Sequence, residues 1–404
     1  MSGSEVPMRA VVRYENVPRD AFKGFPDELT GTAAFRANEL VNFLTEVAAV
    51  NVLESLGIDR ESIVAVTEQL MAESDPLACR QLVDSFAGPA GVAPERLEVF
   101  EWLFEWLSDR ERSIDPGGGL VDEPLETLPG LVEAYERVTG EDATLKPSAD
   151  MIGLATRGYV AFLRAEAEGD KLLFQPGTLE LWDAYFANSH RVTRELNLLG
   201  CLAFERALAG RDGLDVLELG GGLGGAAEML LGRLGGRIGR YHFTDVVPGF
   251  LRRGADRLEE QFSEVRLSTG MVDINRPFGD QCLEKESFDA IYAVNVLHLA
   301  VELVDALERL RELLRPRGRL VLVEGVRAAL HRPIAAEFVF QLLPQFRAVK
   351  VDPETRCRAG FLDDTHWRKS ISVAGFASVE SVPEMSEAVE AYPNHYMAAF
   401  IAGT

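Results

Sequence analysis

Hydrophobic positions in the first part of the chain recur every three or four residues, as they do along one face of a helix. The segment from Asn38 to Ile114 shows this rhythm, beginning with Leu40, Phe43, Leu44, Val47 and Val50. Within it, RLEVFEWLFEWLSDR (residues 96–110) has glutamates on one helical face and large apolar residues around the rest. So wide an apolar surface predicts burial in the protein's own core or, as the alternative, against a second subunit in a homodimer.

The rhythm changes at Leu214, where short β-rich runs begin to alternate with helical ones. The runs are LDVLELG, RYHFTDV, EVRLSTGMVDI, FDAIYAVNV and GRLVLVEGV, and HYMAAFIA follows near the C-terminus. Strands separated by helices predict a doubly wound α/β fold with a mostly parallel sheet. The run DPGGGLVDEP (residues 115–124) concentrates Gly and Pro and is typical of a linker. We therefore predict a helical N-terminal domain over residues 1–115, a linker and helical lid segment over 116–200, and an α/β domain over 201–404.

Composition and charge limit the partners. The 404 residues have a formal charge of −23, which would repel both nucleic acid and an acidic membrane surface. No apolar run is long enough for a membrane helix, and the start MSGSEVPMRA does not resemble a secretion signal. The four cysteines are scattered and form no metal-binding or redox pair, so the sequence indicates a cytoplasmic protein with no metal site.

A glycine-rich turn follows the first β-rich run, in DVLELGGGLGGAAEML (residues 215–230). Gly220, Gly222 and Gly224 would let the backbone approach a ligand at the carboxyl edge of the sheet. A dinucleotide fingerprint and a purely structural turn are the alternatives. Glu218 argues against both alternatives. A carboxylate beside the glycines is poorly placed for an anionic pyrophosphate, and it suits a cationic, amino-acid-bearing ligand.

Two further acids end successive β-rich runs. Asp245 could accept both hydroxyls of a ribose, and Asp273 could meet the edge of a base. Either could instead be an ordinary turn residue. Acids at three successive strand ends favour a nucleoside-containing ligand.

At this point the sequence resembles the class I S-adenosylmethionine-dependent methyltransferases, from Leu214 to the C-terminus. LELGGGLGG matches their E-x-G-x-G-x-G signature, although Leu223 replaces a small hydroxyl residue. The resemblance implies a seven-stranded Rossmann-like sheet with an antiparallel last strand and S-adenosylmethionine as cofactor. It also implies that the glycines line the methionine part, Asp245 the ribose and Asp273 the adenine amino group, with Ile274 and Asn295 nearby.

His298, in AVNVLHLA (residues 293–300), ends the fourth β-rich run, and Glu324 ends the fifth. Those two strands should be neighbours, so a carboxylate could fix the tautomer of a neutral imidazole that acts as a base. The alternative is a packing histidine and an unrelated turn acid.

Four motifs closely resemble the C-methyltransferase domains of polyketide synthases: LELGGGLGG, YHFTDVVPGFL, AVNVLHLA and LLRPRGRLVLVEG. The segment GDKLLFQPGTLELWDAYFANSHRVTRELN resembles the lid that precedes the cofactor domain in those enzymes. The resemblance implies that His298 and Glu324 are the catalytic pair. It implies methylation at the α-carbon of a β-ketoacyl thioester on an acyl carrier protein. Small-molecule O-methyltransferases use the same two positions but usually follow the histidine with an acid and a tryptophan; here Leu299 and Ala300 follow it. A free-standing enzyme for a diffusible acceptor, or a cofactor site kept for regulation, are further alternatives.

Substrate contacts are expected from two segments. The lid offers Tyr185, Asn188 and His190, and FVFQLLPQF after the fifth β-rich run offers Phe338 and Gln341. An acidic carrier protein would need a basic patch; the candidates, each otherwise a solvated face, are Arg252 with Arg253, or Arg347, Lys350, Arg356 and Arg358.

Overall fold

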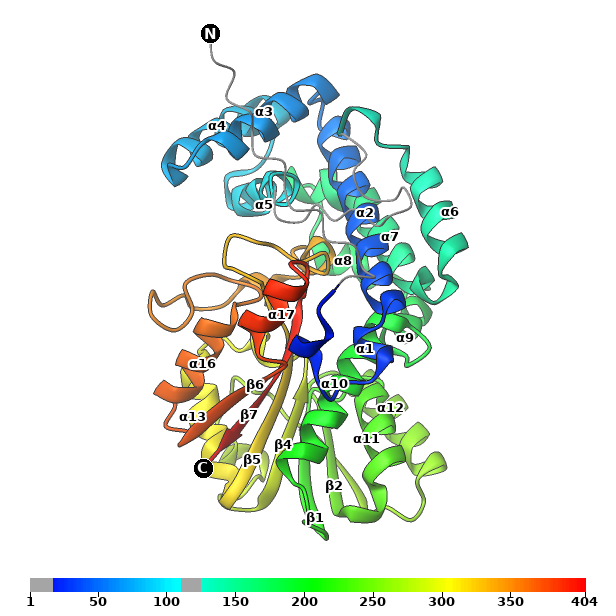
Figure 1. Cartoon of the computed structure of the whole chain (residues 1–404), viewed down its shortest axis with the longest axis vertical. Helices are drawn as coiled ribbons and strands as arrows, with labels where there is room; N and C mark the ends of the chain where they lie inside the picture. Colours follow the sequence, from blue (N-terminus) through cyan, green and yellow to red (C-terminus); the bar gives the residue numbers. More distant parts are fainter. Residues whose placement is uncertain (1–16, 110–124) are drawn as a thin grey trace.

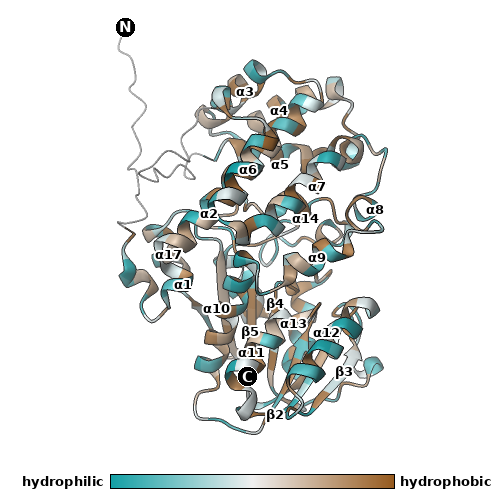
Figure 2. Ribbon diagram, turned by 90° about the vertical axis from the view of Figure 1, so that its right-hand side faces the viewer, coloured by the Kyte–Doolittle hydropathy of each residue, from teal (hydrophilic) through white to brown (hydrophobic). Residues whose placement is uncertain are grey.

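The computed structural model describes residues 17–109 and 125–404. The predicted linker at 115–124 and the start of the chain lie outside the described residues. Helices form one end of the molecule and a sheet flanked by helices forms the other (Figure 1). In Figure 2 most helices carry both apolar and polar residues, as amphipathic helices do.

The helical end is organised around one long helix, α2, which packs against α5, α6 and α7. Asp59 caps α3 by accepting a hydrogen bond from the Ser62 backbone N–H, and Gly91 ends α4 in the left-handed conformation. The helices up to the sheet are α1 (Asp27–Thr30), α2 (Thr32–Ser55), α3 (Arg60–Ala72), α4 (Pro76–Ala90), α5 (Leu97–Leu107), α6 (Leu131–Glu141), α7 (Lys146–Leu163), α8 (Gly169–Leu173), α9 (Leu179–Phe186) and α10 (Arg191–Ala207).

The aromatic helix α5 lies inside this core. Its two tryptophans are 1% exposed and stack at 5.6 Å between ring centroids, so burial within the chain is confirmed for this face. Apolar side chains from α2, α5, α7 and α9 share one cluster with residues 334–361 of the α/β part. The division at residue 115 stays a prediction.

The sheet has seven strands in the order β3-β2-β1-β4-β5-β7-β6, and β7 runs antiparallel to both of its neighbours. The predicted seven-stranded doubly wound fold with an antiparallel last strand is confirmed. The strands are β1 (Leu214–Leu219), β2 (Ile238–Asp245), β3 (Leu267–Met271), β4 (Phe288–Val294), β5 (Leu314–Gly325), β6 (Ser378–Val382) and β7 (Met397–Gly403).

Helices cover both faces of this sheet (Figure 1). One apolar layer joins the sheet to α10, α11 and α12, and the other joins it to α13 and α16. The chain leaves β1 in one direction to form β2 and β3, and then returns to place β4 on the other side of β1. This reversal leaves a crevice at the carboxyl ends of β1 and β4. The remaining helices are α11 (Gly225–Leu234), α12 (Pro248–Gln261), α13 (Leu303–Leu313), α14 (Glu337–Phe340), α15 (Pro344–Arg347), α16 (Asp364–Val373) and α17 (Met385–Ala391).

Within the described ranges no single helix has the length and apolar character needed to cross a membrane. One pair, Asp27–Ser55 with Arg60–Ala72, meets that test jointly, across a 120° bend.

Candidate active site

A cavity of about 560 Å³ lies at the carboxyl edge of the sheet, roofed by residues of α9 and α10 and by the segment from Ile334 to Ala348. Its size is that of a small-molecule site. Seven of the eight predicted cofactor residues line it: Glu218, Gly220, Gly222, Asp245, Asp273, Ile274 and Asn295. Gly224 does not line it; it is the N-cap of α11 with a φ of 87°.

The glycine turn is shaped by close contacts with its neighbours. A Cβ on Gly220, which has a φ of 58°, would lie 2.5 Å from a methyl group of Val296. A Cβ on Gly221 would lie 2.2 Å from the ring of Phe243. Gly221 was not singled out from the sequence because its constraint comes from β2, more than twenty residues away. Gly220, Gly221 and Gly222 all line the cavity, so the turn presents its backbone to that space.

Asp245 braces this turn from the end of β2. Its carboxylate accepts hydrogen bonds from the Gly222 N–H at 2.8 Å and from the Val247 N–H at 2.7 Å. Burial raises the pKa of Asp245, and these N–H groups oppose the rise. Each oxygen keeps a second lone pair for a ligand hydroxyl.

Glu218 is 1% exposed, and its Oε2 has no hydrogen-bond partner within the described part of the chain. Burial raises the pKa of Glu218 to about 8, and the charge of Asp245 adds to the rise. Among the described residues no basic side chain pairs with either acid, and two such buried acids suit a cationic ligand that carries hydroxyl groups. S-adenosylmethionine, with an ammonium, a sulfonium and a ribose, fits this set.

Two residues complete the cofactor side. Asp273 lies two residues beyond β3 and accepts a hydrogen bond from the Asn275 N–H at 2.9 Å. Asn295 follows β4 with a φ of 59°, and its N–H donates to the Val323 oxygen at 2.6 Å. The Asn295 Oδ1 is buried at the cavity with no hydrogen-bond partner among the described residues.

The structure brings His298 and Glu324 together, as their strand ends predict. The Nδ1 of His298 lies 2.7 Å from Glu324 Oε2, and the two side chains are 4% and 0% exposed. The other oxygen, Oε1, accepts from the backbone N–H groups of Val296, Leu297 and His298 at 3.0, 2.7 and 3.3 Å. Because Glu324 is acceptor-only when ionised, Nδ1 carries the proton and Nε2 keeps its lone pair.

Arg356 holds the same turn from its other side. Its guanidinium is 1% exposed and donates to the carbonyl oxygens of His298 and Ala300. Burial lowers the pKa of Arg356 to about 10, and the charge of Glu324 opposes that effect. The sequence analysis missed this contact because 58 residues separate Arg356 from His298 and no periodic pattern links them.

Two phenylalanines enclose the imidazole. The rings of Phe361 and Phe346 lie 4.7 and 5.6 Å from the His298 ring. Phe361 lines the cavity, as do Val296 and Leu299 on either side of the histidine, whereas His298 itself does not. The imidazole therefore lies next to residues that line the cavity, Phe361 among them.

The structure brings only some of the predicted substrate contacts to the cavity. Tyr185 does line the cavity, but His190 is a fully buried structural residue that bonds to Ser148 Oγ and the Tyr185 oxygen. Burial lowers the pKa of His190 to about 4. The amide of Asn188 is occupied by Gly225, Glu228 and Asn197.

The segment after β5 is corrected in the same way. Phe338 is fully buried and stacks on Tyr159 at 4.7 Å, and Gln341 is not among the residues that line the cavity. Phe340 and Gln345 line the cavity in their place. A segment of short helical turns has no regular period, so the sequence did not show which side chains face inward.

Most of the basic residues considered for a carrier-protein surface contact other side chains of this chain. Arg347 is half-buried over the Phe162 ring, Arg358 pairs with Glu105, and Lys350 pairs with Glu302. Arg252 and Arg253 remain as exposed residues on α12.

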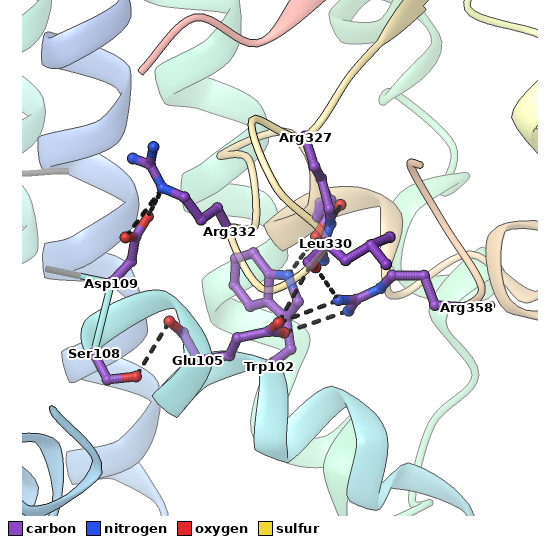
Figure 3. Close-up of polar contacts among 9 residues, drawn as sticks. Trp102, Glu105, Ser108, Asp109, Arg327, Leu330, Arg332 and Arg358 are labelled. Atoms are coloured by element: carbon purple, nitrogen blue, oxygen red, sulfur yellow. Dashed lines mark hydrogen bonds and ion pairs between the residues drawn. The ribbon is translucent and has the colours of Figure 1, made fainter. Parts of the chain in front are cut away.

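A buried ion-pair network ties the segment after Glu324 to α5 (Figure 3). Arg327 donates to Glu337 and to Glu105, and Arg358 donates to Glu105 at 3.1 Å. Burial favours the neutral form of Glu105, but Arg327 and Arg358 hold its pKa below the ordinary value. The Trp102 Nε1–H donates to Glu337 as well. The helical end therefore fixes the backbone that leads away from the histidine–glutamate pair.

In the described part of the chain no three His, Cys, Asp or Glu side chains come together as metal ligands would.

A doubly wound sheet with this strand order, a glycine turn after β1 and acids at the ends of β1 and β2 define the class I methyltransferase fold. Residues 217–320 match the family model described as a methyltransferase domain. The chain therefore carries a methyltransferase domain, whose cofactor is S-adenosylmethionine.

The relatives that the chain matches are polyketide synthases. Compactin diketide synthase mlcB of Penicillium citrinum is 29% identical over 248 residues, which are 60% of this chain and 9% of that protein. Lovastatin diketide synthase mokB of Monascus pilosus is 33% identical over 167 residues, 41% of this chain and 6% of that protein. A highly reducing polyketide synthase of Pyrenophora dematioidea is 26% identical over 75% of this chain and 11% of that protein. The chain thus spans about a tenth or less of the length of these relatives.

Three solved structures share the fold over nearly the whole chain. They are the CurJ carbon methyltransferase (TM-score 0.68, 22% identity, 93% of this chain and 94% of that one), the DszA carbon methyltransferase (0.69, 18%, 98% and 97%) and the CMeT domain of the citrinin polyketide synthase (0.64, 19%, 98% and 99%). The likeness includes the helical end, so the whole chain has the fold of these carbon methyltransferase domains.

Proposed function

We propose that this methyltransferase methylates the α-carbon of a β-ketoacyl thioester carried on an acyl carrier protein. The observation that carries the proposal is the 2.7 Å contact between His298 Nδ1 and Glu324 Oε2, next to the cavity that holds the cofactor residues. The polyketide synthase relatives supply the substrate class.

The reaction needs a base and a positioned methyl group. A carbon between two carbonyls is acidic enough for a neutral imidazole to take its proton. S-adenosylmethionine supplies an electrophilic methyl group on a sulfonium. The α-proton moves to His298 Nε2 and the α-carbon forms a bond to the methyl carbon. The methyl–sulfur bond breaks, and its electron pair stays on the sulfur.

Glu324 serves this step in two ways. Its Oε2 holds the Nδ1–H tautomer and stabilises the imidazolium after proton transfer. Its Oε1 holds three backbone N–H groups of the turn that carries the histidine, so the imidazole is oriented before the substrate arrives. Arg356 adds a second anchor through the carbonyl oxygens of the same turn.

Phe361 contacts the imidazole and lines the cavity, so we expect its side chain to control access to Nε2. The apolar wall of Leu299, Phe340 and Phe361 also excludes water from the base. These side chains suit an acyl chain better than a polar, freely diffusing acceptor.

The test is methyl transfer from isotope-labelled S-adenosylmethionine to an acetoacetyl group on a carrier protein, with the product mapped by mass spectrometry and NMR. We expect a gain of one CH₂ unit at the α-carbon. His298→Gln should keep cofactor affinity and lose most turnover, whereas the matched control His242→Gln, on β2 away from the cavity, should keep both. Label on an oxygen would refute carbon methylation. Cofactor binding without S-adenosylhomocysteine formation on keto and hydroxyl acceptors would point to a regulatory site.

A further inference from the structure

A second, smaller cavity of about 60 Å³ lies between the helical end and the α/β part. Its walls come from α2, α7, the segment 328–339 and residues 393–396. Cavities at such junctions are frequent ligand sites. Nothing in the function proposed above uses it.

This second cavity continues the large one. Five residues line both: Tyr185, Val192, Ile334, Ala336 and Tyr396. None of these shared residues belongs to the glycine turn or is one of the acids predicted to hold the cofactor. A substrate bound in the large cavity could therefore extend into the second one.

The two cavities differ in how exposed their lining residues are. The large cavity has exposed lining residues at Val301, Gln345 and Ala348, which give it a mouth for a tethered substrate. The second cavity is walled mainly by buried side chains, including Ile152 and Ala335, at 3% and 8% exposure. None of its lining residues is exposed, so the large cavity is the better entrance for a carrier arm, which must cross the surface.

The lining of the second cavity combines apolar walls with two polar side-chain atoms. Most of the walls are aliphatic or aromatic, but two buried polar atoms have no hydrogen-bond partner within the described residues: Tyr396 Oη and His395 Nε2. Burial raises the pKa of Tyr396 well above its ordinary value and lowers that of His395 to about 4, so both are neutral near pH 7. A neutral hydroxyl that can donate and a neutral imidazole nitrogen that can accept suit a hydroxyl group on an otherwise apolar ligand.

We propose that the second cavity binds the distal end of the acyl chain, beyond the β-keto group, and that Tyr396 or His395 contacts an oxygen on that end. This inference rests on the proposed function. A volume of 60 Å³ has room for about four water-sized groups, so it sets a limit on chain length. The cavity would make the enzyme selective for chains that have reached a given length.

The test measures kcat/KM for β-ketoacyl thioesters of increasing length, from acetoacetyl to homologues extended by two, four and six carbons. The kcat/KM of the wild-type enzyme should rise with acyl-chain length until the second cavity is filled, and should fall for longer chains. Ala335→Leu fills the cavity and should lower kcat/KM for the extended chains about tenfold, with little effect on acetoacetyl. Ile152→Ala enlarges it and should move the optimum to a longer chain.

The control for the added leucine is Ala72→Leu, at the exposed end of α3. Thermal unfolding and cofactor titration confirm that each variant is folded. Because the two cavity variants act in opposite directions, one poorly folded variant does not leave the proposal untested. Tyr396→Phe should reduce the preference for a chain with a hydroxyl group over its deoxy homologue.

Equal effects of Ala335→Leu on short and extended chains would overturn the inference while leaving the proposed function intact. It would also be overturned if the variant discriminates between pantetheine and shorter thiol handles of acetoacetate, since the arm would then occupy the cavity. Absence of C-methylation with every thioester would instead reject the proposed function itself.

Discussion

Replacing Glu324 by glutamine separates the charge of this side chain from its shape. Glutamine keeps an oxygen that can accept from the backbone N–H groups of Val296 and Leu297. It loses the negative charge, and its amide N–H₂ would face His298 Nδ1. The imidazole would then accept at Nδ1 and carry its proton at Nε2, where the base needs a lone pair.

The expected magnitude follows from the contact. A hydrogen bond to a charged group contributes about 1.5–3 kcal/mol, and losing that much stabilisation of the imidazolium slows turnover about 10- to 150-fold. The wrong tautomer adds to this loss, so the upper end is expected. The free energy of unfolding should fall by only about 1–3 kcal/mol, since the turn keeps its acceptor.

The assay combines single-turnover methyl transfer with exchange of the substrate α-hydrogen for deuterium in heavy water. Both rates should fall together in Glu324→Gln, because both require proton removal at the α-carbon, while cofactor affinity is unchanged. Glu387→Gln, the same change at an exposed site on α17, is the matched control. Wild-type turnover in folded Glu324→Gln would refute the role of the pair as a base.

Three further outcomes are expected. The pKa of Glu218 is about 8, and a bound cation favours its ionised form, so cofactor binding at pH 7 should release a proton and should weaken as the pH falls. Titration calorimetry in buffers of different ionisation enthalpy would measure the proton release, and Glu218→Gln should abolish that release. His190 has a folded pKa of about 4 against 6.5 unfolded, so its neutral form contributes about 3 kcal/mol that is present above pH 6.5 and lost as the pH falls through 4. The stability difference between wild type and His190→Gln in urea unfolding should therefore shrink from pH 7.5 to pH 4.5; a constant difference would contradict the assigned pKa. Gly221→Ala should disrupt the cofactor turn, because its Cβ would overlap the Phe243 ring at 2.2 Å, and loss of cofactor binding in a folded protein would be the readout; unchanged affinity would show that the turn can shift.

The hydrophobic pattern from Leu214 onward was sufficient to predict the sheet, its helices and the cofactor edge. Strand and helix periods are local, and the carboxyl ends of parallel strands necessarily meet at one edge. For the same reason the meeting of His298 with Glu324 followed from two adjacent strand ends. Burial of the α5 tryptophans followed from the width of that helix's apolar surface.

Residues in irregular segments could not be placed in this way. His190 and Phe338 looked like substrate contacts but are buried side chains. Phe361 gave no signal, and Arg356 was expected in a basic surface patch, yet both lie against the turn that carries His298. A turn without a period does not show which side faces a cavity. Contacts over 58 residues depend on how the layers pack.

The sequence by itself thus determined the fold class and the pair of side chains at the strand ends, because both depend on local periodicity and on the edge geometry of a parallel sheet. The methyl donor was implied by the resemblance of its motifs to a known family. The tertiary structure decided the rest. It brings Phe361 against the imidazole, Arg356 to the carbonyl oxygen of His298, and α5 into ion pairs with the segment after β5. It also forms the second cavity between the helical end and the α/β part. These features exist only where elements distant in sequence pack together, and packing between such elements is set by the shapes of many side chains at once.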